Sequence, residues 1–171
     1  VDANARYQRG LTYAALGVYG QAVEDYTAAV DLDPEHCGAY FQRGLAYRHL
    51  REWEKAVADY TRVIRLRPTS ANAYNNRGSA RNEKGDPDGA IEDFNTAIKH
   101  NARYAAAYFN RANARAAKGE VFDAVKDYDI AIRYNRRNVN AYMARGALLL
   151  ASGATAKARS DMKMAVRLDR K

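Results

Sequence analysis

Cysteine, histidine, proline and long apolar runs are scarce in this 171-residue sequence. The single cysteine, Cys37, has no second thiol with which to form an intramolecular disulfide or share a metal ion, so we interpret it as an inert structural residue. The longest apolar stretch, Ala147 to Ala151, is far shorter than the roughly 20 residues that span a membrane. We therefore expect neither a disulfide scaffold nor insertion into a membrane.

The sequence also lacks the residue patterns of an active site. Its three histidines, His36, His49 and His100, have no metal-ligand spacing, and no glycine-rich loop resembles a phosphate cradle. Glu83 and His49 come without a nucleophile or an oxyanion donor. The sequence therefore predicts a protein that is not an enzyme and that needs no metal or cofactor.

The composition favours a folded, helical protein. Hydrophobic residues make up 47% of the chain and charged residues 28%, which is far from the composition of a disordered protein. Alanine and arginine dominate, and this mixture suits helices better than strands. Because the chain starts at Val1 and Asp2 without an initiator methionine or a signal-like leader, we interpret it as a fragment of a longer protein.

The sequence repeats itself every 34 residues without gaps. The repeated segments are Gln8-Arg9-Gly10, Gln42-Arg43-Gly44, Asn76-Arg77-Gly78, Asn110-Arg111-Ala112 and Ala144-Arg145-Gly146. The repeats cover residues 3–36, 37–70, 71–104, 105–138 and 139–171, the last being one residue short. Positions within a repeat are numbered from these starts.

Small and apolar residues recur at fixed positions of the repeat. Position 3 is always alanine, at Ala5, Ala39, Ala73, Ala107 and Ala141. Position 20 is also always alanine, at Ala22, Ala56, Ala90, Ala124 and Ala158. Position 24 is large and apolar or aromatic, at Tyr26, Tyr60, Phe94, Tyr128 and Met162. This spacing predicts a buried helix face, on which alanine lets two backbones approach closely.

Each repeat contains the signals for two helices. Gly17, Gly85, Gly119 and Gly153 suit the left-handed conformation that ends a helix, and Arg51 is the exception at that position. Asp86-Pro87 then predicts an N-cap followed by the first residue of a second helix. Because a lone pair of helices about 14 residues long cannot bury its own apolar faces, the pairs must stack on their neighbours.

The second repeat resembles the tetratricopeptide signature of aromatic, Gly, Tyr, Ala, aromatic and Pro. Its matching residues are Tyr40, Gly44, Tyr47, Ala56, Tyr60 and Pro68. The resemblance covers the whole chain, although position 11 changes from Tyr13 and Tyr47 to Arg81, Arg115 and Leu149. It implies an all-α, right-handed superhelical solenoid of five helix-turn-helix repeats, forming a single domain over residues 1–171. The repeats look like those of bacterial members, which favours the cytoplasm, with the periplasm as the alternative.

Tetratricopeptide proteins bind peptides or partner domains in a concave groove lined by the first helix of each repeat. The resemblance therefore implies a non-catalytic scaffold for protein–protein interaction. Its candidate binding residues are Gln8, Gln42, Asn76 and Asn110 at position 6, Tyr7, Phe41, Asn75 and Phe109 at position 5, and Asn72, Asn113 and Asn140 nearby. A row of carboxamides could hydrogen-bond the main chain of an extended peptide. The alternative is that the aromatic rings only seal adjacent repeats and that the amides are solvated.

The groove does not match family members that grip the acidic carboxyl ends of chaperones. Those domains need lysine, asparagine and arginine at fixed positions of three repeats. The corresponding places here hold Phe41, Leu45, Asn76, Ala106 and Asn110. Only asparagine agrees, so we expect a different partner, whose identity the sequence leaves open.

An arginine at position 7 and an aspartate at position 23 recur in every repeat. The arginines are Arg9, Arg43, Arg77, Arg111 and Arg145, and the aspartates are Asp25, Asp59, Asp93, Asp127 and Asp161. Since one charge lies on each helix, we expect each arginine to pair with an aspartate of its own or the adjoining repeat, with its stem packed on apolar surface. We interpret these residues as structural ion pairs.

The net charge of +8 is unevenly distributed, with −3, +4, 0, +3 and +5 on the successive repeats and Asp2 outside them. An acidic leading end and a basic trailing end favour head-to-tail contact between copies of the chain. The basic charge also raises single-stranded RNA as a partner. Neutral groove positions and the alternation of arginines with acidic residues disfavour that class.

Overall fold

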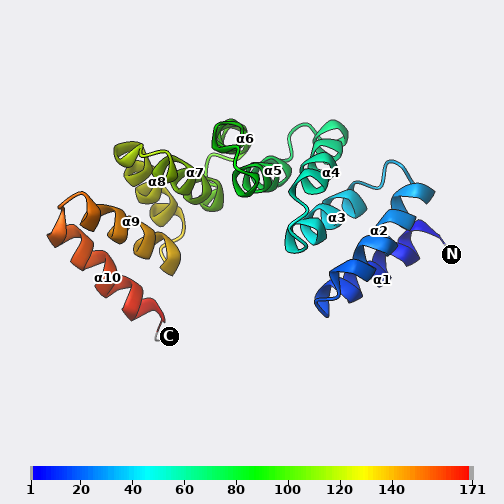
Figure 1. The fold of residues 1–171 in the computed structure, drawn as a ribbon, viewed down its shortest axis with the longest axis horizontal. Helices are drawn as coiled ribbons and strands as arrows, with labels where there is room; N and C mark the ends of the chain where they lie inside the picture. The colour runs from blue at the N-terminus through cyan, green and yellow to red at the C-terminus, as the bar shows by residue number, and fades with distance from the viewer. Residues whose placement is uncertain (1, 170–171) are drawn as a thin grey trace. The chain divides into compact units, whose positions relative to one another are not determined.

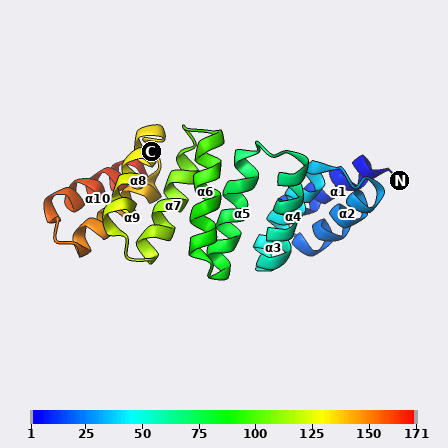
Figure 2. The same ribbon diagram turned by 90° about the horizontal axis from the view of Figure 1, so that it is seen from above.

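The computed structural model describes residues 2–169, which form ten α-helices and no strand (Figures 1 and 2). The chain divides into two compact units, Val1–Asp86 and Pro87–Lys171. The first unit contains α1 (Ala3–Ala15), α2 (Tyr19–Leu32), α3 (Cys37–His49), α4 (Trp53–Leu66) and α5 (Ala71–Lys84). The second contains α6 (Pro87–His100), α7 (Ala105–Ala117), α8 (Val121–Tyr134), α9 (Val139–Ala151) and α10 (Thr155–Asp169).

The helices follow the 34-residue period. The odd-numbered helices α1 to α9 each begin at the first residue of a repeat, and the even-numbered helices complete the pairs. Within each unit every helix packs against the next helix along the chain, and first helices of consecutive repeats also touch, as α1 does α3 and α3 does α5. The prediction of an all-α fold of helix-turn-helix repeats is confirmed. The boundary between the units falls inside the third repeat, and a single domain over residues 1–171 stays a prediction.

The helix ends are set by local chemistry. Gly17, Gly85, Gly119 and Gly153 adopt positive φ angles of 76°, 96°, 81° and 84°. Arg51 adopts the same conformation, with φ at 61°, although it carries a side chain. Position 34 caps the first helix of the following repeat in three of four cases. The side chains of His36, Ser70 and Asn138 each accept a hydrogen bond from a main-chain N–H three residues later, whereas Tyr104 makes no such bond.

The core lies where alanines and aromatic rings of neighbouring helices meet. The alanines at position 20 and four of those at position 3 are buried, whereas Ala5 at the leading end is exposed. Tyr26 and Tyr60 are fully buried against them. Gly10 is required on α1 because a Cβ there would lie 2.6 Å from Cε1 of Tyr26. The repeated small residues therefore make room for the rings at position 24.

In the part of the chain that the structure describes, every helix is too short or too polar to cross a bilayer.

Candidate functional site

A pocket of about 230 Å³ lies in the first unit and is lined by residues of α1, α3, α4, the α4–α5 connection and α5. It gathers four of the predicted binding residues, Tyr7, Phe41, Gln42 and Asn72. The remaining lining residues are Cys37, Gly38, Val63, Arg67 and Ser70. The pocket therefore has aromatic and aliphatic walls together with two carboxamides and one guanidinium.

The aromatic residues of this pocket both line it and seal adjacent repeats. Tyr7 packs on the buried Ala29, Val30 and Ala39, which belong to the first and second repeats. The ring of Phe41 lies edge-on to that of Tyr60, with the centroids 5.6 Å apart. Both rings stay partly exposed. The two interpretations of position 5 are thus compatible, because each ring packs within the fold and also lines the pocket.

The two glutamines of position 6 differ from the asparagine that follows them. Among residues 2–169, the carboxamides of Gln8 and Gln42 have no hydrogen-bond partner within the chain. Asn76, by contrast, donates from Nδ2 to the main-chain oxygen of Asn72 at 2.9 Å and accepts from Nη1 of Arg48 at 3.3 Å. Gln8 and Gln42 therefore keep their full hydrogen-bonding capacity for a ligand, and Asn76 keeps only part of it.

Asn75 lies in the interior of the fold. Its residue is only 6% exposed on α5, so the side chain that was predicted to line the groove is buried in the fold. Position 5 is half-buried in the first two repeats, where it is aromatic. The sequence position alone did not distinguish these environments.

The second unit places its predicted residues in separate surroundings. Phe109 on α7 packs against Tyr128, with ring centroids 6.0 Å apart, and Asn110 is half-buried on the same helix. Asn113 accepts a hydrogen bond from the hydroxyl of Tyr128 at 2.7 Å, so part of its capacity is used internally. Asn140 is exposed on α9, where it lines a different pocket at the trailing end.

Four of the five predicted arginine–aspartate pairs have two hydrogen bonds each within one repeat. In every case Nε and Nη2 of the arginine donate to the two carboxylate oxygens. The distances are 2.7 and 2.7 Å for Arg9–Asp25, 2.8 and 2.8 Å for Arg43–Asp59, 2.8 and 2.6 Å for Arg111–Asp127, and 2.8 and 2.6 Å for Arg145–Asp161. Arg77 and Asp93 belong to different units, so their pairing stays a prediction.

In four of the five repeats, Nη1 of the arginine reaches the preceding repeat, at a position that the sequence analysis did not name. Nη1 donates to position 25, namely from Arg43 to Thr27, from Arg77 to Thr61, from Arg111 to Asn95 and from Arg145 to Asp129. The signal was present, since position 25 holds an oxygen-bearing side chain in the first four repeats. Each guanidinium thus fastens two layers together, which supports a structural role.

The pKa of Asp25 in the first repeat agrees with a structural role for the arginine–aspartate pairs. Hydrogen bonds from Arg9 hold the pKa of the Asp25 carboxyl below its ordinary value, against the opposing effect of burial, and Arg6 adds a further bond at 3.2 Å.

A second ion pair that the sequence analysis missed joins Arg48 on α3 to Glu83 on α5 at 2.8 Å. Among the described residues, no cluster of three or more His, Cys, Asp or Glu side chains could hold a metal ion.

The comparisons with known proteins agree with the repeat pattern. Tetratricopeptide repeat family models match residues 7–71, 119–171 and 71–104. No curated protein matches the sequence. A structure of MamA is 24% identical over 94% of each chain, with a TM-score of 0.84. MamA from Desulfovibrio magneticus RS-1 is 15% identical over 98% of this chain and 95% of that one, with a TM-score of 0.87.

YrrB, described as a TPR protein with an unusual peptide-binding site, has the same fold. It is 16% identical over 99% of this chain and 88% of its own, with a TM-score of 0.74. Tetratricopeptide repeats are typically non-catalytic modules for protein interaction. The family models match more than half of the chain, and the helix pairs follow the same 34-residue period. The chain therefore belongs to the tetratricopeptide repeat family.

Proposed function

We propose that this protein is an interaction scaffold that binds an extended peptide, or an extended segment of a partner domain, on the first helices of its first unit. The observation that carries the proposal is the 230 Å³ pocket in which Tyr7, Phe41, Gln42 and Asn72 come together. The peptide-binding site named for YrrB, a protein of the same fold, supports this class of ligand.

The lining of the pocket suggests the chemistry of the peptide. An apolar side chain of the peptide would enter the pocket and contact Tyr7, Phe41 and Val63. The unpaired carboxamide of Gln42 offers both a donor and an acceptor to the peptide main chain. Arg67 is exposed, and its guanidinium has no ion-pair partner in residues 2–169, so an acidic residue beside the apolar one would complete the contact.

The single cysteine provides a direct test. Peptides that bind the full chain would be selected from a random library, and their affinity measured by fluorescence polarisation before and after Cys37 is alkylated with a bulky maleimide. Because Cys37 lines the pocket, alkylation should abolish binding, and bound peptide should slow the alkylation. A Cys37→Ala protein treated with the same reagent should still bind. Equal affinity for alkylated and untreated protein would disprove the proposal.

A matched pair of glutamine variants tests the hydrogen bond. Gln42→Ala should weaken binding of the selected peptides about fivefold, as expected for the loss of one hydrogen bond worth about 1 kcal/mol. Gln21 is exposed on α2, away from the pocket, and Gln21→Ala should leave the affinity unchanged. Equal effects of the two substitutions would mean that Gln42 does not touch the peptide.

A second candidate function is end-to-end assembly of copies. A pocket of about 340 Å³ in the last repeat is lined by Val139, Met143, Met162 and Val166, and Met143 and Val166 are 50% and 52% exposed. The last repeat carries a net charge of +5 and the first −3, so the ends attract each other. Analytical ultracentrifugation should show association that weakens in salt and in Val166→Glu. A monomer at high concentration and low ionic strength would exclude this candidate.

A further inference from the structure

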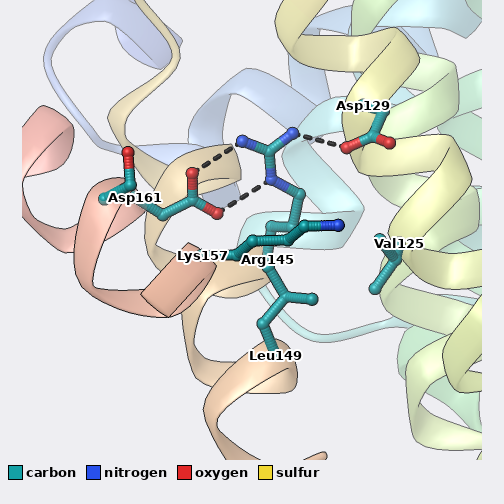
Figure 3. A pocket seen from close by; sticks show the side chains of 7 residues that line it. Val125, Asp129, Arg145, Leu149, Lys157 and Asp161 are labelled. Carbon is teal, nitrogen blue, oxygen red and sulfur yellow. Dashed lines mark hydrogen bonds and ion pairs between the residues drawn. The ribbon is translucent and has the colours of Figure 1, made fainter. Parts of the chain in front are cut away.

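A third pocket, of about 310 Å³, lies in the second unit among α8, α9 and α10 (Figure 3). Val125 and Asp129 come from α8, Arg145 and Leu149 from α9, and Lys157 and Asp161 from α10. None of these residues belongs to the predicted peptide-binding set. The pocket therefore needs an explanation of its own.

The two cations of the pocket are in different states. Arg145 is fixed, because its guanidinium donates to both oxygens of Asp161 at 2.6 and 2.8 Å and to Asp129 at 2.5 Å (Figure 3). Lys157 has no ion-pair or hydrogen-bond partner among residues 2–169, and its side chain extends toward the Val125 side of the pocket in Figure 3. The pocket thus holds one guanidinium neutralised by the carboxylates of Asp129 and Asp161 and one unpaired ammonium, beside the apolar side chains of Val125 and Leu149.

In the second repeat, the residues equivalent to Arg145 and Lys157 contact a tyrosine ring. There the ring of Tyr47, at position 11, has Arg43 at position 7 with its Cζ 5.9 Å from the ring centroid. Lys55 at position 19 has its Nζ 5.4 Å from the same centroid. Both distances are within the range of cation–π attraction. Tyr47 therefore occupies a site made by an arginine and a lysine of its own repeat.

The fifth repeat keeps the same two cations but lacks the ring. Positions 7 and 19 are Arg145 and Lys157, while position 11 is Leu149. In the fourth repeat, position 11 is also a long side chain, Arg115. Its Nη1 donates a hydrogen bond to Asp127 at 2.7 Å. Leucine is shorter than tyrosine or arginine, and the 310 Å³ pocket lies at the place where it falls short.

We propose that this pocket binds the side chain of a tyrosine presented by a partner protein. The partner's ring takes the place that Tyr47 occupies in the second repeat, with Arg145 and Lys157 as its cationic neighbours and Val125 and Leu149 as its apolar walls. The site lies in the second unit and includes residues of α10, the second helix of the fifth repeat, so it does not depend on the pocket of the first unit. The chain thus has an aromatic-specific contact in addition to its peptide-binding surface.

The probe for this site is N-acetyl-L-tyrosinamide, titrated into the full ¹⁵N-labelled chain and followed by NMR chemical shifts. We expect saturable shifts at the amides of Arg145, Leu149 and Lys157, and binding of N-acetyl-L-leucinamide at least about fivefold weaker, because leucine lacks the π face. Shifts that map to other helices, or equal binding of the two compounds, would overturn the proposal.

Two variants with a matched control complete the test. Leu149→Tyr restores the ring of the second repeat, so it should remove binding while the unfolding midpoint stays at or above that of the wild type. Lys157→Met should weaken binding about two- to fivefold, the effect of losing one exposed cation–π contact. Lys163→Met removes an exposed lysine of α10 that does not line the pocket, and it should have no effect. Unchanged binding in both Leu149→Tyr and Lys157→Met would place the tyrosine elsewhere.

Discussion

The hydroxyl of Tyr128 donates a hydrogen bond to Oδ1 of Asn113, 2.7 Å away. The equivalent residue of the first repeat, Tyr26, is fully buried, and its hydroxyl has no hydrogen-bond partner in the described chain. The reason is position 9, which is Asn113 in the fourth repeat and Leu11 in the first. The same buried hydroxyl is therefore satisfied in one layer and unsatisfied in another.

This difference predicts opposite costs for the same substitution. Tyr128→Phe leaves the acceptor of Asn113 unpaired and should lower the free energy of unfolding by about 1 kcal/mol. Tyr26→Phe removes a polar group that has no partner, so its effect should lie between zero and a stabilisation of about 1 kcal/mol. Urea denaturation of the two variants beside the wild type measures both values. Equal destabilisation would show that Tyr26 has a partner.

Stability should fall in alkaline solution. Burial raises the pKa of Tyr26 to about 12, whereas a tyrosine of the unfolded chain ionises near pH 10. Between these values the unfolded state loses the proton and the folded state keeps it, so the free energy of unfolding decreases by up to about 1.4 kcal/mol per pH unit. The contribution is complete below about pH 10 and is lost by about pH 12. In Tyr26→Phe the slope should be shallower, and an identical slope would contradict the assignment.

The buried ion pairs should be costly to break. Asp127 has a side chain only 3% exposed and accepts from both Arg111 and Arg115. Asp127→Ala leaves these guanidinium groups uncompensated and should destabilise the protein by about 3 to 5 kcal/mol. Asp123 and Lys126 form a surface pair at 3.9 Å with both side chains more than half exposed, so Asp123→Ala should cost about 0 to 1 kcal/mol. Thermal unfolding compares the two, and similar costs would refute the structural role of Asp127.

Two glycine-to-alanine substitutions should change the free energy of unfolding in opposite directions. A Cβ on Gly44 would lie 2.9 Å from Cε1 of Tyr60, so Gly44→Ala should destabilise the protein by about 1 to 3 kcal/mol despite the helix propensity of alanine. Gly20 lies in α2 with no atom within 4 Å of the added Cβ, and Gly20→Ala should stabilise by about 0.5 to 1 kcal/mol. Circular dichroism during urea titration gives both values. A stabilising Gly44→Ala would mean that the ring of Tyr60 can move aside.

The sequence by itself determined where the helix pairs lie along the chain. The 34-residue period located the helix pairs, and it also located the helix end at Arg51, whose residue type gives no such signal but whose φ angle is 61°. The recurrence of arginine and aspartate likewise indicated the ion pairs. These features repeat because each helix pair packs against its neighbours in the same way, so the 34-residue period alone predicts them.

Only the tertiary structure decided which polar groups remain available to a ligand. Asn75 is buried, Asn76 is hydrogen-bonded to Arg48, and Asn113 is hydrogen-bonded to Tyr128, although all three belong to the carboxamide-rich set that the sequence assigned to binding. The partners of Asn76 and Asn113, which are Arg48 and Tyr128, lie on other helices, so the position of the asparagine within its own repeat does not reveal them. A hydrogen bond depends on where two side chains meet in space, and that meeting follows from the packing of one layer on the next.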